Sequence, residues 1–330
     1  MPPAPEYMAP VVTIVVPAYN EEHNVRPVYE ALRGSVEDAE DFELIFVDDG
    51  SRDGTAAEVR RLCAEDSRVR LIRFGRNFGH QAALMAGLEA MRGAVVVTLD
   101  CDLQHPPELL PQMLAAWRRG ARVVQMVRVH TPGVGLFKSI SSNLFYRFLN
   151  LLSEAPITAG AADYQLLDRT VVDAVLQFRD RSPFLRGLVA WLGYPTMHIE
   201  YTARERASGS SQYTLRKMLR LAVHAVTGLS AKPLRFSFYL GMASALLCLI
   251  YAAFAIAAML DGRTVAGWTS VIVAVTFLGA VQLVSIGVLG EYLARVYEQT
   301  RGMPRYVVVE TEDAHTQSAL SPPGNLASNY

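Results

Sequence analysis

Two long apolar runs near the C-terminus constrain this chain more than any other feature. Residues 236–260 and 268–290 form runs of 25 and 23 residues without a charged side chain. As helices they would be about 34–37 Å long, which is enough to cross a hydrocarbon core of about 30 Å. The seven residues DGRTVAG separate them. The sequence therefore predicts a transmembrane hairpin, since core helices of soluble proteins seldom keep so long a run free of charge.

The charges that flank the hairpin predict its orientation. Basic residues gather before the first run and after the second, whereas the connecting loop carries Arg263 alone. The flanking basic residues are Arg216, Lys217, Arg220, Lys232, Arg235, Arg295, Arg301 and Arg305. Segments rich in Lys and Arg stay on the cytoplasmic side of a membrane. We therefore expect a multi-pass protein of the inner (plasma) membrane, with its large N-terminal part and both termini in the cytoplasm.

The overall composition argues against several classes of protein. The formal net charge is −1, so we expect no nucleic-acid partner. The three cysteines are far apart and include no C-x-x-C pair, which argues against a disulfide scaffold and a zinc site. The first ten residues, MPPAPEYMAP, lack the basic and apolar regions of a signal peptide, and we expect them to form a flexible arm.

Strand-like and helix-like segments alternate in the part of the chain that precedes the hairpin. Amphipathic helical patterns occur at residues 55–65 and 79–92. The apolar strand-like runs are residues 11–16, 42–47, 69–74, 95–99 and 122–127. This alternation predicts a parallel, doubly wound α/β sheet, which binds ligands beyond the carboxyl ends of its strands. No G-x-G-x-x-G follows the first strand and no P-loop motif occurs, so a dinucleotide site and a P-loop are disfavoured.

Polar clusters follow three of these strands, where such a sheet would bind its ligand. They are PAYNEE, DDGSRDGT and DCDLQH. In the third cluster Asp100, Asp102 and Gln104 alternate, so an extended backbone would direct three oxygen ligands to one side. This set suits Mg²⁺ or Mn²⁺, although a solvated acidic turn would have the same pattern. In the first two clusters Tyr19 can stack on a base and Asp49 can accept hydrogen bonds from a base or ribose.

These patterns divide the chain into five parts. The parts are a flexible arm (1–10), an α/β domain (11–213), an amphipathic interfacial helix (214–235), the transmembrane hairpin (236–290) and a cytoplasmic tail (291–330), which we expect to be disordered from about residue 311. Residues 136–152 carry a further apolar stripe at helical spacing. Beside membrane spans such a stripe suits a helix in the bilayer interface, although ordinary core packing would leave the same pattern.

Several motifs in order carry a resemblance to a known family. VVTIVVPAYNEE, FELIFVDDGSRDGT, VVVTLDCDLQHPPELL and SPFLRGLVAWLGY precede two spans and GEYLARVYEQTRGMPRYVV. Together they resemble the family 2 glycosyltransferases that act on polyprenyl phosphates. These are relatives of dolichol-phosphate mannose synthase, and the layout is most similar to bacterial undecaprenyl-phosphate glycosyltransferases with two C-terminal spans. The resemblance covers roughly residues 11–310 and implies a GT-A fold, a nucleotide-sugar donor and inversion at the anomeric carbon.

The resemblance also implies which residues form the site. Those that match the nucleotide-sugar pocket are Pro17, Tyr19, Glu21, Val47, Asp49 and Cys101. Those that match the ligands of a Mg²⁺ or Mn²⁺ ion are Asp100, Asp102 and Gln104, and the catalytic residues would be Asp102 and Asp163. Those that match the acceptor-phosphate site are Arg128, Lys138, Ser142, Arg206 and Gln212. We expect Asp163 to position a sugar hydroxyl or the arginines, because an ionised phosphate needs no general base.

The expected reaction is inverting transfer of a sugar to a membrane lipid. The donor would be a UDP-sugar, with glucose as the default sugar, and the acceptor undecaprenyl phosphate, for modification of a cell-envelope glycan. The resemblance further implies a homo-oligomer such as a tetramer. Two departures stand out, because Gln165 and Gln212 occupy positions where the family has Arg and Lys. They leave open a catalytically inactive membrane scaffold. A processive polysaccharide synthase would need a Q-x-x-R-W motif and further spans, which the sequence lacks.

Overall fold

The computed structural model describes most of the chain as two compact units. The described residues are 12–36, 41–129, 158, 160–178, 180, 184–202, 230–261 and 267–313. One unit contains the described residues up to 202 together with those from 304 onward, and the other contains those from 230 to 303. The arm, the stripe at 136–152 and most of the interfacial helix expected at 214–235 lie outside the described residues.

An eight-stranded sheet forms the centre of the first unit. Its strands are β1 (Val12–Ala18), β2 (Phe42–Asp48), β3 (Val69–Phe74), β4 (Val95–Thr98), β5 (Val123–Arg128), β6 (Ala161–Asp168), β7 (Thr196–Tyr201) and β8 (Val308–Glu312). They are ordered β7-β5-β6-β4-β1-β2-β3-β8. Strands β4, β1, β2 and β3 run parallel to one another, as the alternating sequence pattern predicted. Their continuous apolar character suits strands that are covered on both faces.

The sheet is mixed, which corrects the expectation of a parallel sheet. Strand β6 runs antiparallel to both β4 and β5, and β8 runs antiparallel to β3. Strand β8 is an antiparallel edge strand, which is common on an otherwise parallel sheet, whereas β6 lies inside the sheet between β5 and β4. The direction of β6 matters for the site, because its first residues lie at the edge where β4 ends.

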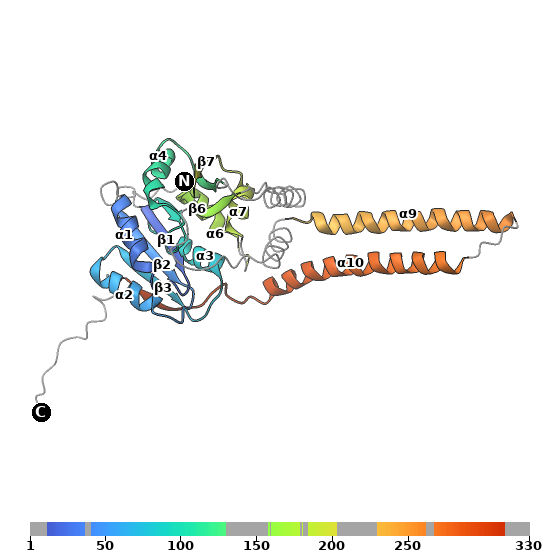
Figure 1. Ribbon diagram of the computed structural model, residues 1–330, viewed down its shortest axis with the longest axis horizontal. Coiled ribbons are helices and arrows are strands. Elements are labelled where there is room, and N and C mark those ends of the chain that lie inside the picture. The colour runs from blue at the N-terminus through green and yellow to red at the C-terminus, as the bar shows by residue number, and fades with distance from the viewer. Residues whose placement is uncertain are drawn as a thin grey trace, which may run out of the picture. The chain divides into compact units, whose positions relative to one another are not determined.

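Helices cover both faces of the sheet and enclose two apolar clusters (Figure 1). On one face lie α1 (Val25–Val36), α2 (Thr55–Glu65) and α4 (Leu110–Arg118), the last preceded by the 3₁₀ turn Pro107–Leu109. On the other face lie α3 (His80–Ala90), α6 (Arg169–Leu176) and α7 (Leu185–Leu192). The fold is therefore a three-layer α/β sandwich, which is the architecture that strand–helix alternation predicts.

Helix α3 lies unusually close to the middle of the sheet. A Cβ atom at Gly87 would be 2.2 Å from Cγ1 of Val15 on β1, so no side chain fits there. The small residues of AALMAGLEA allow this approach. As a result the first residue of the helix, His80, is held at the carboxyl edge of the sheet.

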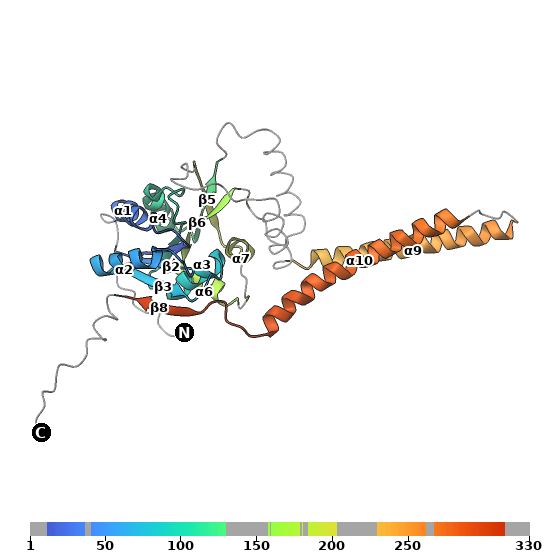
Figure 2. The same ribbon diagram turned by 60° about the horizontal axis from the view of Figure 1, so that its bottom comes forward.

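The second unit is a pair of long helices that lie side by side (Figures 1 and 2). Helix α9 spans Lys232–Leu260 and α10 spans Trp268–Thr300, so each extends the apolar run from which it was predicted. Both are long and apolar enough to cross a membrane. Most described side chains in them are exposed, including Phe236, Phe254 and Leu283. Such a surface is stable where lipid covers it, which makes this chain a membrane-associated protein.

The segment that follows α10 returns to the sheet, which the sequence did not lead us to expect. Strand β8, at Val308–Glu312, pairs with β3 and forms one edge of the sheet (Figure 2). Tyr306 stacks on Phe74 with ring centroids 4.7 Å apart, and Gly75 donates its N–H to the carbonyl of Val307 at 3.1 Å.

Asp168 is expected to stabilise the fold more than a typical surface carboxylate. It caps α6 by accepting from Thr170 N at 3.0 Å, and it also accepts from Trp117 Nε1 and Arg122 Nη1, both at 2.8 Å. Asp168→Ala removes a helix cap and leaves a partly buried indole N–H without its partner. We expect a loss of about 2–4 kcal/mol in the free energy of unfolding, measured by urea denaturation.

The control for that prediction is Asp173→Asn on the same helix, which removes one exposed pair with Arg169 and should cost less than about 0.5 kcal/mol. Burial opposes ionisation of Asp168, but its hydrogen bonds lower the pKa of the carboxyl. Its stabilisation is therefore complete above about pH 4 and is lost as the pH falls through the lowered pKa. Equal stability of Asp168→Ala and wild type at neutral pH would contradict this role.

Candidate active site

The register of the strands brings several loops to one edge of the sheet. Ala18 at the end of β1 pairs with Asp48 at the end of β2, and Thr98 at the end of β4 pairs with Val15. Thr98 also pairs with Gln165 on the antiparallel strand β6. Two residues beyond that pair lie Asp100 and Asp163, which side-chain alternation places on the same face. The edge therefore collects acidic groups from four strands.

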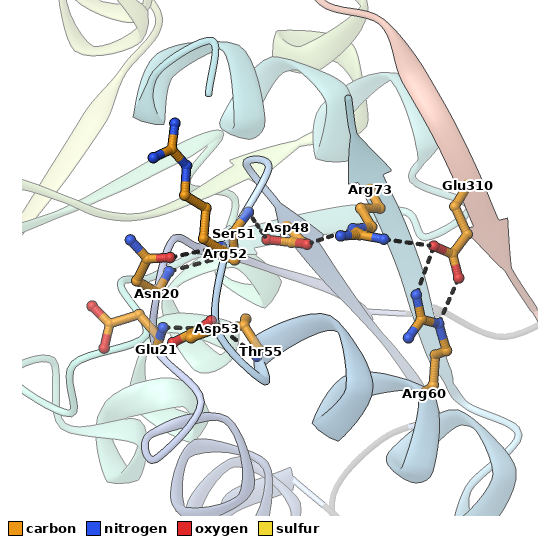
Figure 3. Close-up of polar contacts among 10 residues, drawn as sticks. All are labelled: Asn20, Glu21, Asp48, Ser51, Arg52, Asp53, Thr55, Arg60, Arg73 and Glu310. Carbon is orange, nitrogen blue, oxygen red and sulfur yellow. Dashed lines mark hydrogen bonds and ion pairs between the residues drawn. The ribbon is translucent and has the colours of Figure 1, made fainter. Parts of the chain in front are cut away.

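The loops after β1 and β2 are fastened to each other (Figure 3). Asn20 donates its backbone N–H to Ser51 Oγ at 2.9 Å, and its side-chain oxygen accepts from Arg52 N at 2.9 Å. Glu21 donates its backbone N–H to Thr55 Oγ1 at 2.8 Å. These bonds hold Asn20 at φ +56°, a left-handed conformation that is uncommon for residues other than glycine. We call the two joined loops, residues 19–24 and 49–55, the loop clasp.

Asp49 organises a third loop. Its carboxylate accepts from the backbone N–H groups of Phe78 at 2.6 Å and Gly79 at 2.9 Å. The side chain is buried, and burial raises the pKa of Asp49 although both hydrogen bonds oppose that change. The sequence predicted that Asp49 contacts a nucleotide. In the structure both carboxylate oxygens already hold the segment that leads into α3.

The other predicted nucleotide-binding residues differ in accessibility. Tyr19 is 42% exposed, and Glu21 is partly exposed beside Asn24. Pro17 and Val47 are buried, and the Val47 side chain packs in the apolar cluster on the α3 face of the sheet. Cys101 packs in the opposite cluster, where burial raises the pKa of its thiol far above the ordinary value. Among these residues Tyr19 and Glu21 can therefore reach a ligand with their side chains.

The loop that follows β4, residues 99–105, is held by a neutral histidine; we call it the acidic loop. Asp100 donates its backbone N–H to His105 Nδ1 at 3.1 Å, which leaves the ring proton on Nε2, 3.7 Å from the Asp100 carboxylate. Burial lowers the pKa of His105, and its ring stacks on Tyr164 at 5.1 Å. Leu103, between Asp100 and His105 in the chain, has φ +57°, so the loop turns back sharply. The histidine fixes that turn.

Gln104 links the acidic loop to the predicted acceptor arginine. Its backbone N–H donates to Asp102 Oδ1 at 3.0 Å, while its side-chain oxygen accepts from Arg128 Nη2 at 2.8 Å. The sequence predicted Gln104 as a metal ligand. In the structure its amide oxygen is engaged by a cation from the end of β5. The acidic loop and Arg128 therefore form one connected group.

A histidine and an arginine balance the charge of Asp163. His80 Nε2 lies 3.2 Å from Asp163 Oδ2 and 3.6 Å from Asp100 Oδ1. Arg186 Nε, from α7, lies 2.8 Å from Asp163 Oδ1. Burial opposes both charges, but the mutual attraction raises the pKa of His80 to about 9 and lowers that of Asp163 to about 2. Both groups are thus charged at neutral pH.

Gln81 ties this cluster to α7. Its side-chain nitrogen donates to Asp163 Oδ2 at 3.3 Å, and its oxygen accepts from the backbone N–H of Leu185 at 2.9 Å. The sequence analysis assigned no role to His80, Gln81, His105 or Arg186. The segments FGRNFGHQ, DLQHPP and PFLRGL contain them, but a single polar residue in a loop or at a helix start has no periodic pattern that reveals its partner.

The acidic loop suits a divalent ion that a substrate also ligates. Among the described residues, no three His, Cys, Asp or Glu side chains are grouped to hold a metal by themselves. Asp100 is 37% exposed, and the Nε2 atoms of His80 and His105, at 3.6 and 3.7 Å from its carboxylate, are beyond hydrogen-bond distance. Two carboxylates on one loop fit Mg²⁺ or Mn²⁺, which commonly takes its remaining ligands from phosphates and water. Lys138, Ser142, Arg206 and Gln212 lie outside the described residues.

Comparison with known proteins identifies the family. Residues 13–176 match the model of glycosyl transferase family 2, and residues 232–296 match the GtrB C-terminal hairpin. An uncharacterized glycosyltransferase of Bacillus subtilis, YkcC, is 37% identical and covers 90% of this chain and 92% of its own length. This chain belongs to glycosyl transferase family 2. The resemblance predicted from the motifs is confirmed, and the α/β unit is a glycosyltransferase domain of the GT-A class.

Other proteins similar to this family 2 glycosyltransferase also align over most of both chains. The bactoprenol glucosyl transferase of Shigella phage SfX is 35% identical over 90% of this chain and 98% of its own length. Among solved structures, a mannosyltransferase of Pyrobaculum calidifontis in complex with GDP-Man and Mn²⁺ is 19% identical, with a TM-score of 0.49 over 90% of this chain and 89% of its own. The match to the phage enzyme includes the region of the apolar hairpin, because it spans nearly the whole chain.

Gly50, within the loop clasp, provides a test of the site's geometry. It has φ +71°, and a Cβ there would be 2.4 Å from the backbone carbon of Arg76. Gly50→Ala should destabilise the protein by about 2 kcal/mol or more and weaken nucleotide-sugar binding, measured by urea denaturation and by titration of the donor.

Gly34→Ala is the matched control, because Gly34 is exposed on α1 with nothing within 4 Å of the added carbon. It should stabilise the protein by about 0.5–1 kcal/mol, since alanine favours a helix over glycine. If Gly50→Ala bound the donor as tightly as Gly34→Ala does, the tight packing of the loop clasp would not matter for binding.

Proposed function

We propose that this enzyme transfers a sugar from a nucleotide-sugar to a membrane polyprenyl phosphate with inversion at the anomeric carbon. The default assignment is glucose from a UDP-sugar to undecaprenyl phosphate, yielding a lipid-linked sugar for modification of a cell-envelope glycan. The observation that carries the proposal is the connected group of Asp102, Gln104 and Arg128, on the same loop as Asp100, in a chain that also has an apolar hairpin. The phage relative named for bactoprenol glucosyl transfer supports the same assignment.

The donor would lie across the loop clasp and the acidic loop. Tyr19, exposed beside the clasp, would stack on the base, and Glu21 would face the ribose. Asp100 and Asp102 would hold a Mg²⁺ or Mn²⁺ ion with the donor diphosphate, with Gln104 close by. When bound, that ion neutralises the charge that develops on the leaving diphosphate. His105 holds the acidic loop through the Asp100 N–H and would thereby keep the Asp100 carboxylate in position for the ion.

The acceptor phosphate would approach from the side of Arg128. A phosphate oxygen attacks C1 of the sugar, the bond from C1 to the donor diphosphate breaks, and the nucleoside diphosphate leaves. A phosphate monoester has its second pKa at about 6, so the nucleophile is ionised at neutral pH without a general base. Arg128 would pair with the acceptor phosphate and reduce its repulsion from the donor. Lys138, Ser142, Arg206 and Gln212 would complete this phosphate site.

Asp163 acts in this proposal as a positioning group. A carboxyl with a pKa of about 2 is a weak proton acceptor at neutral pH, because a useful base has a pKa close to the working pH. Its oxygens are engaged by His80, Gln81 and Arg186. It would orient His80, Arg186 and a sugar hydroxyl rather than take a proton from the acceptor.

Membrane topology follows from charge. Basic residues flank the hairpin on the side of the glycosyltransferase domain, so both termini and that domain would lie in the cytoplasm. A nucleotide-sugar is a cytoplasmic metabolite and a polyprenyl phosphate resides in the bilayer, so both substrates would meet at this surface. The resemblance to this family favours a homo-oligomer such as a tetramer.

The proposed function is tested by a donor panel. Membranes containing the full chain are incubated with radiolabelled nucleotide-sugars, and the lipid fraction is extracted with and without added polyprenyl phosphate. We expect label in the lipid for one sugar, rising with added lipid, and the product should release that sugar in mild acid. Label in long polysaccharide would indicate a processive synthase, and no label with any donor would favour an inactive scaffold.

The metal requirement is tested by Asp102→Ala and by chelation. Loss of Asp102 should lower kcat/KM about 100-fold or more, because the leaving diphosphate loses its counter-charge. EDTA should have the same effect on the wild type, and added Mg²⁺ or Mn²⁺ should restore transfer. The control Asp173→Ala, at an exposed position of α6, should transfer at the wild-type rate. Full activity in metal-free buffer would rule out this part of the proposal.

A further inference from the structure

The chain that follows α10 is held on the sheet by side chains as well as by strand pairing. Arg305 donates to the carbonyl of Asp180 at 2.7 Å, and Tyr306 bonds to Glu89. Within β8, Glu310 lies directly opposite Arg73 of β3. Every one of these contacts joins residues far apart in sequence. The docked segment, residues 305–313, is therefore an integral part of the glycosyltransferase domain even though it comes after the apolar hairpin.

Glu310 is the centre of an ionic cluster on this segment (Figure 3). Arg60, on α2, donates to both of its oxygens, from Nε at 2.6 Å and from Nη2 at 2.8 Å. Arg73, on β3, donates from Nη1 to one of them at 3.4 Å. The hydrogen bond to Arg60 is the main cause of a lowered pKa at Glu310, so the carboxylate is charged at neutral pH. A two-pronged arginine contact of this kind has a well-defined geometry.

Arg73 also contacts a buried carboxylate. Its Nε lies 3.2 Å from Asp48 Oδ2, and Asp48 is completely buried at the end of β2. Burying a carboxylate is costly unless a cation and hydrogen-bond donors compensate for the lost water. Arg73 supplies the cation here, and Glu310 in turn fixes the position of Arg73 from the other side.

Asp48 leads directly into the loop clasp. Its second oxygen accepts from the backbone N–H of Ser51 at 2.9 Å. The hydroxyl of the same serine accepts from the backbone N–H of Asn20 at 2.9 Å. Figure 3 shows the resulting series of contacts from Glu310 through Arg73, Asp48 and Ser51 to Asn20. Each contact is polar and directional, so moving one end changes the geometry available to the next.

We propose that Glu310 is a positioning residue for the nucleotide-sugar donor, acting through Arg73 and Asp48 on the loop clasp. This inference rests on the proposed function, because it takes the clasp to be part of the donor site. It assigns a role in donor binding to a segment that lies after both apolar helices and far in sequence from every predicted nucleotide-binding residue. Donor affinity thus depends on the docking of β8.

A merely structural role would be to cover the edge of β3, because an exposed strand edge invites unwanted pairing. That role requires the backbone of β8 and not the charge of Glu310. Glu310→Gln distinguishes the positioning role from the structural role. It keeps the strand and the size of the side chain but removes the negative charge. Glu310→Asp keeps the charge on a shorter side chain and is the conservative variant.

The control is a second arginine–glutamate pair that also involves helix α2. Glu65, also on α2, accepts from Arg26 through two hydrogen bonds of 2.9 Å, as Glu310 does from Arg60. Arg26 belongs to α1 and pairs with Glu58 and Glu65, so this pair does not lead to Asp48. Glu65→Gln therefore removes a matched ionic contact while leaving the series from Glu310 to Asn20 intact.

The first measurement is amide hydrogen exchange in the full chain, which needs no turnover. In Glu310→Gln the peptides covering residues 19–24 and 50–55 should exchange about threefold faster or more than in wild type. Glu65→Gln should leave them unchanged, and Glu310→Asp should recover most of the protection. Wild-type exchange of both peptides in Glu310→Gln would overturn the inference. This outcome is independent of whether the protein transfers a sugar.

The second measurement separates donor binding from chemistry. In Glu310→Gln, KM for the nucleotide-sugar should rise about five- to tenfold, while kcat and the KM for the lipid acceptor stay within twofold of wild type. If Glu310→Gln lowered the thermal stability but left the donor KM unchanged, β8 would only cover the edge of β3. That result would also overturn the inference. If the wild type transferred no sugar, the proposed function would fail, and the exchange result would still decide whether Glu310 controls the loop clasp.

Discussion

The fold depends on holding many carboxylates at one edge of a sheet. Parallel β1, β2 and β4 end there, and antiparallel β6 begins there, so Asp48, Asp49, Asp100 and Asp163 come close together. Like charges in such proximity repel unless something compensates for them. Arg73 compensates for Asp48, two backbone N–H groups for Asp49, and His80 with Arg186 for Asp163. Asp100 keeps the most open carboxylate, and this is where a cation and a diphosphate would complete the balance.

Local patterns predicted the fold where local sequence determines it. The apolar runs of β1 to β5 and the charge-free runs within α9 and α10 were visible, because periodicity and length alone specify such elements. Strand β6 was missed because AADYQLLD mixes buried polar residues with apolar ones, and its direction is set by distant partners. Strand β8 was missed because VVETE has two glutamates and follows a membrane span, where a polar tail is the usual expectation.

The candidate site was predictable to the extent that motifs mark it. The alternation of Asp100 and Asp102 predicted a metal site, and the resemblance predicted an acceptor site at Arg128. In the structure Gln104 connects Asp102 to Arg128. A motif specifies a position in the chain but not the direction of a side chain, which is why Val47 and Cys101 turn out to pack in the core. The balancing groups His80 and Arg186 had no signal, since a charge pair between α3, β6 and α7 exists only after folding.

The central claim is that Asp100 and Asp102 hold a divalent ion together with the nucleotide of the donor. Electron paramagnetic resonance of Mn²⁺ tests it directly, because free and protein-bound Mn²⁺ give different signals. Titrating Mn²⁺ into the full chain with a nucleoside diphosphate should remove one equivalent of free ion beyond what the nucleotide binds without protein. The double variant Asp100→Asn and Asp102→Asn should remove no more than the nucleotide alone, while Asp173→Asn should behave as wild type. Equal Mn²⁺ binding by the wild type and the double variant would contradict the account.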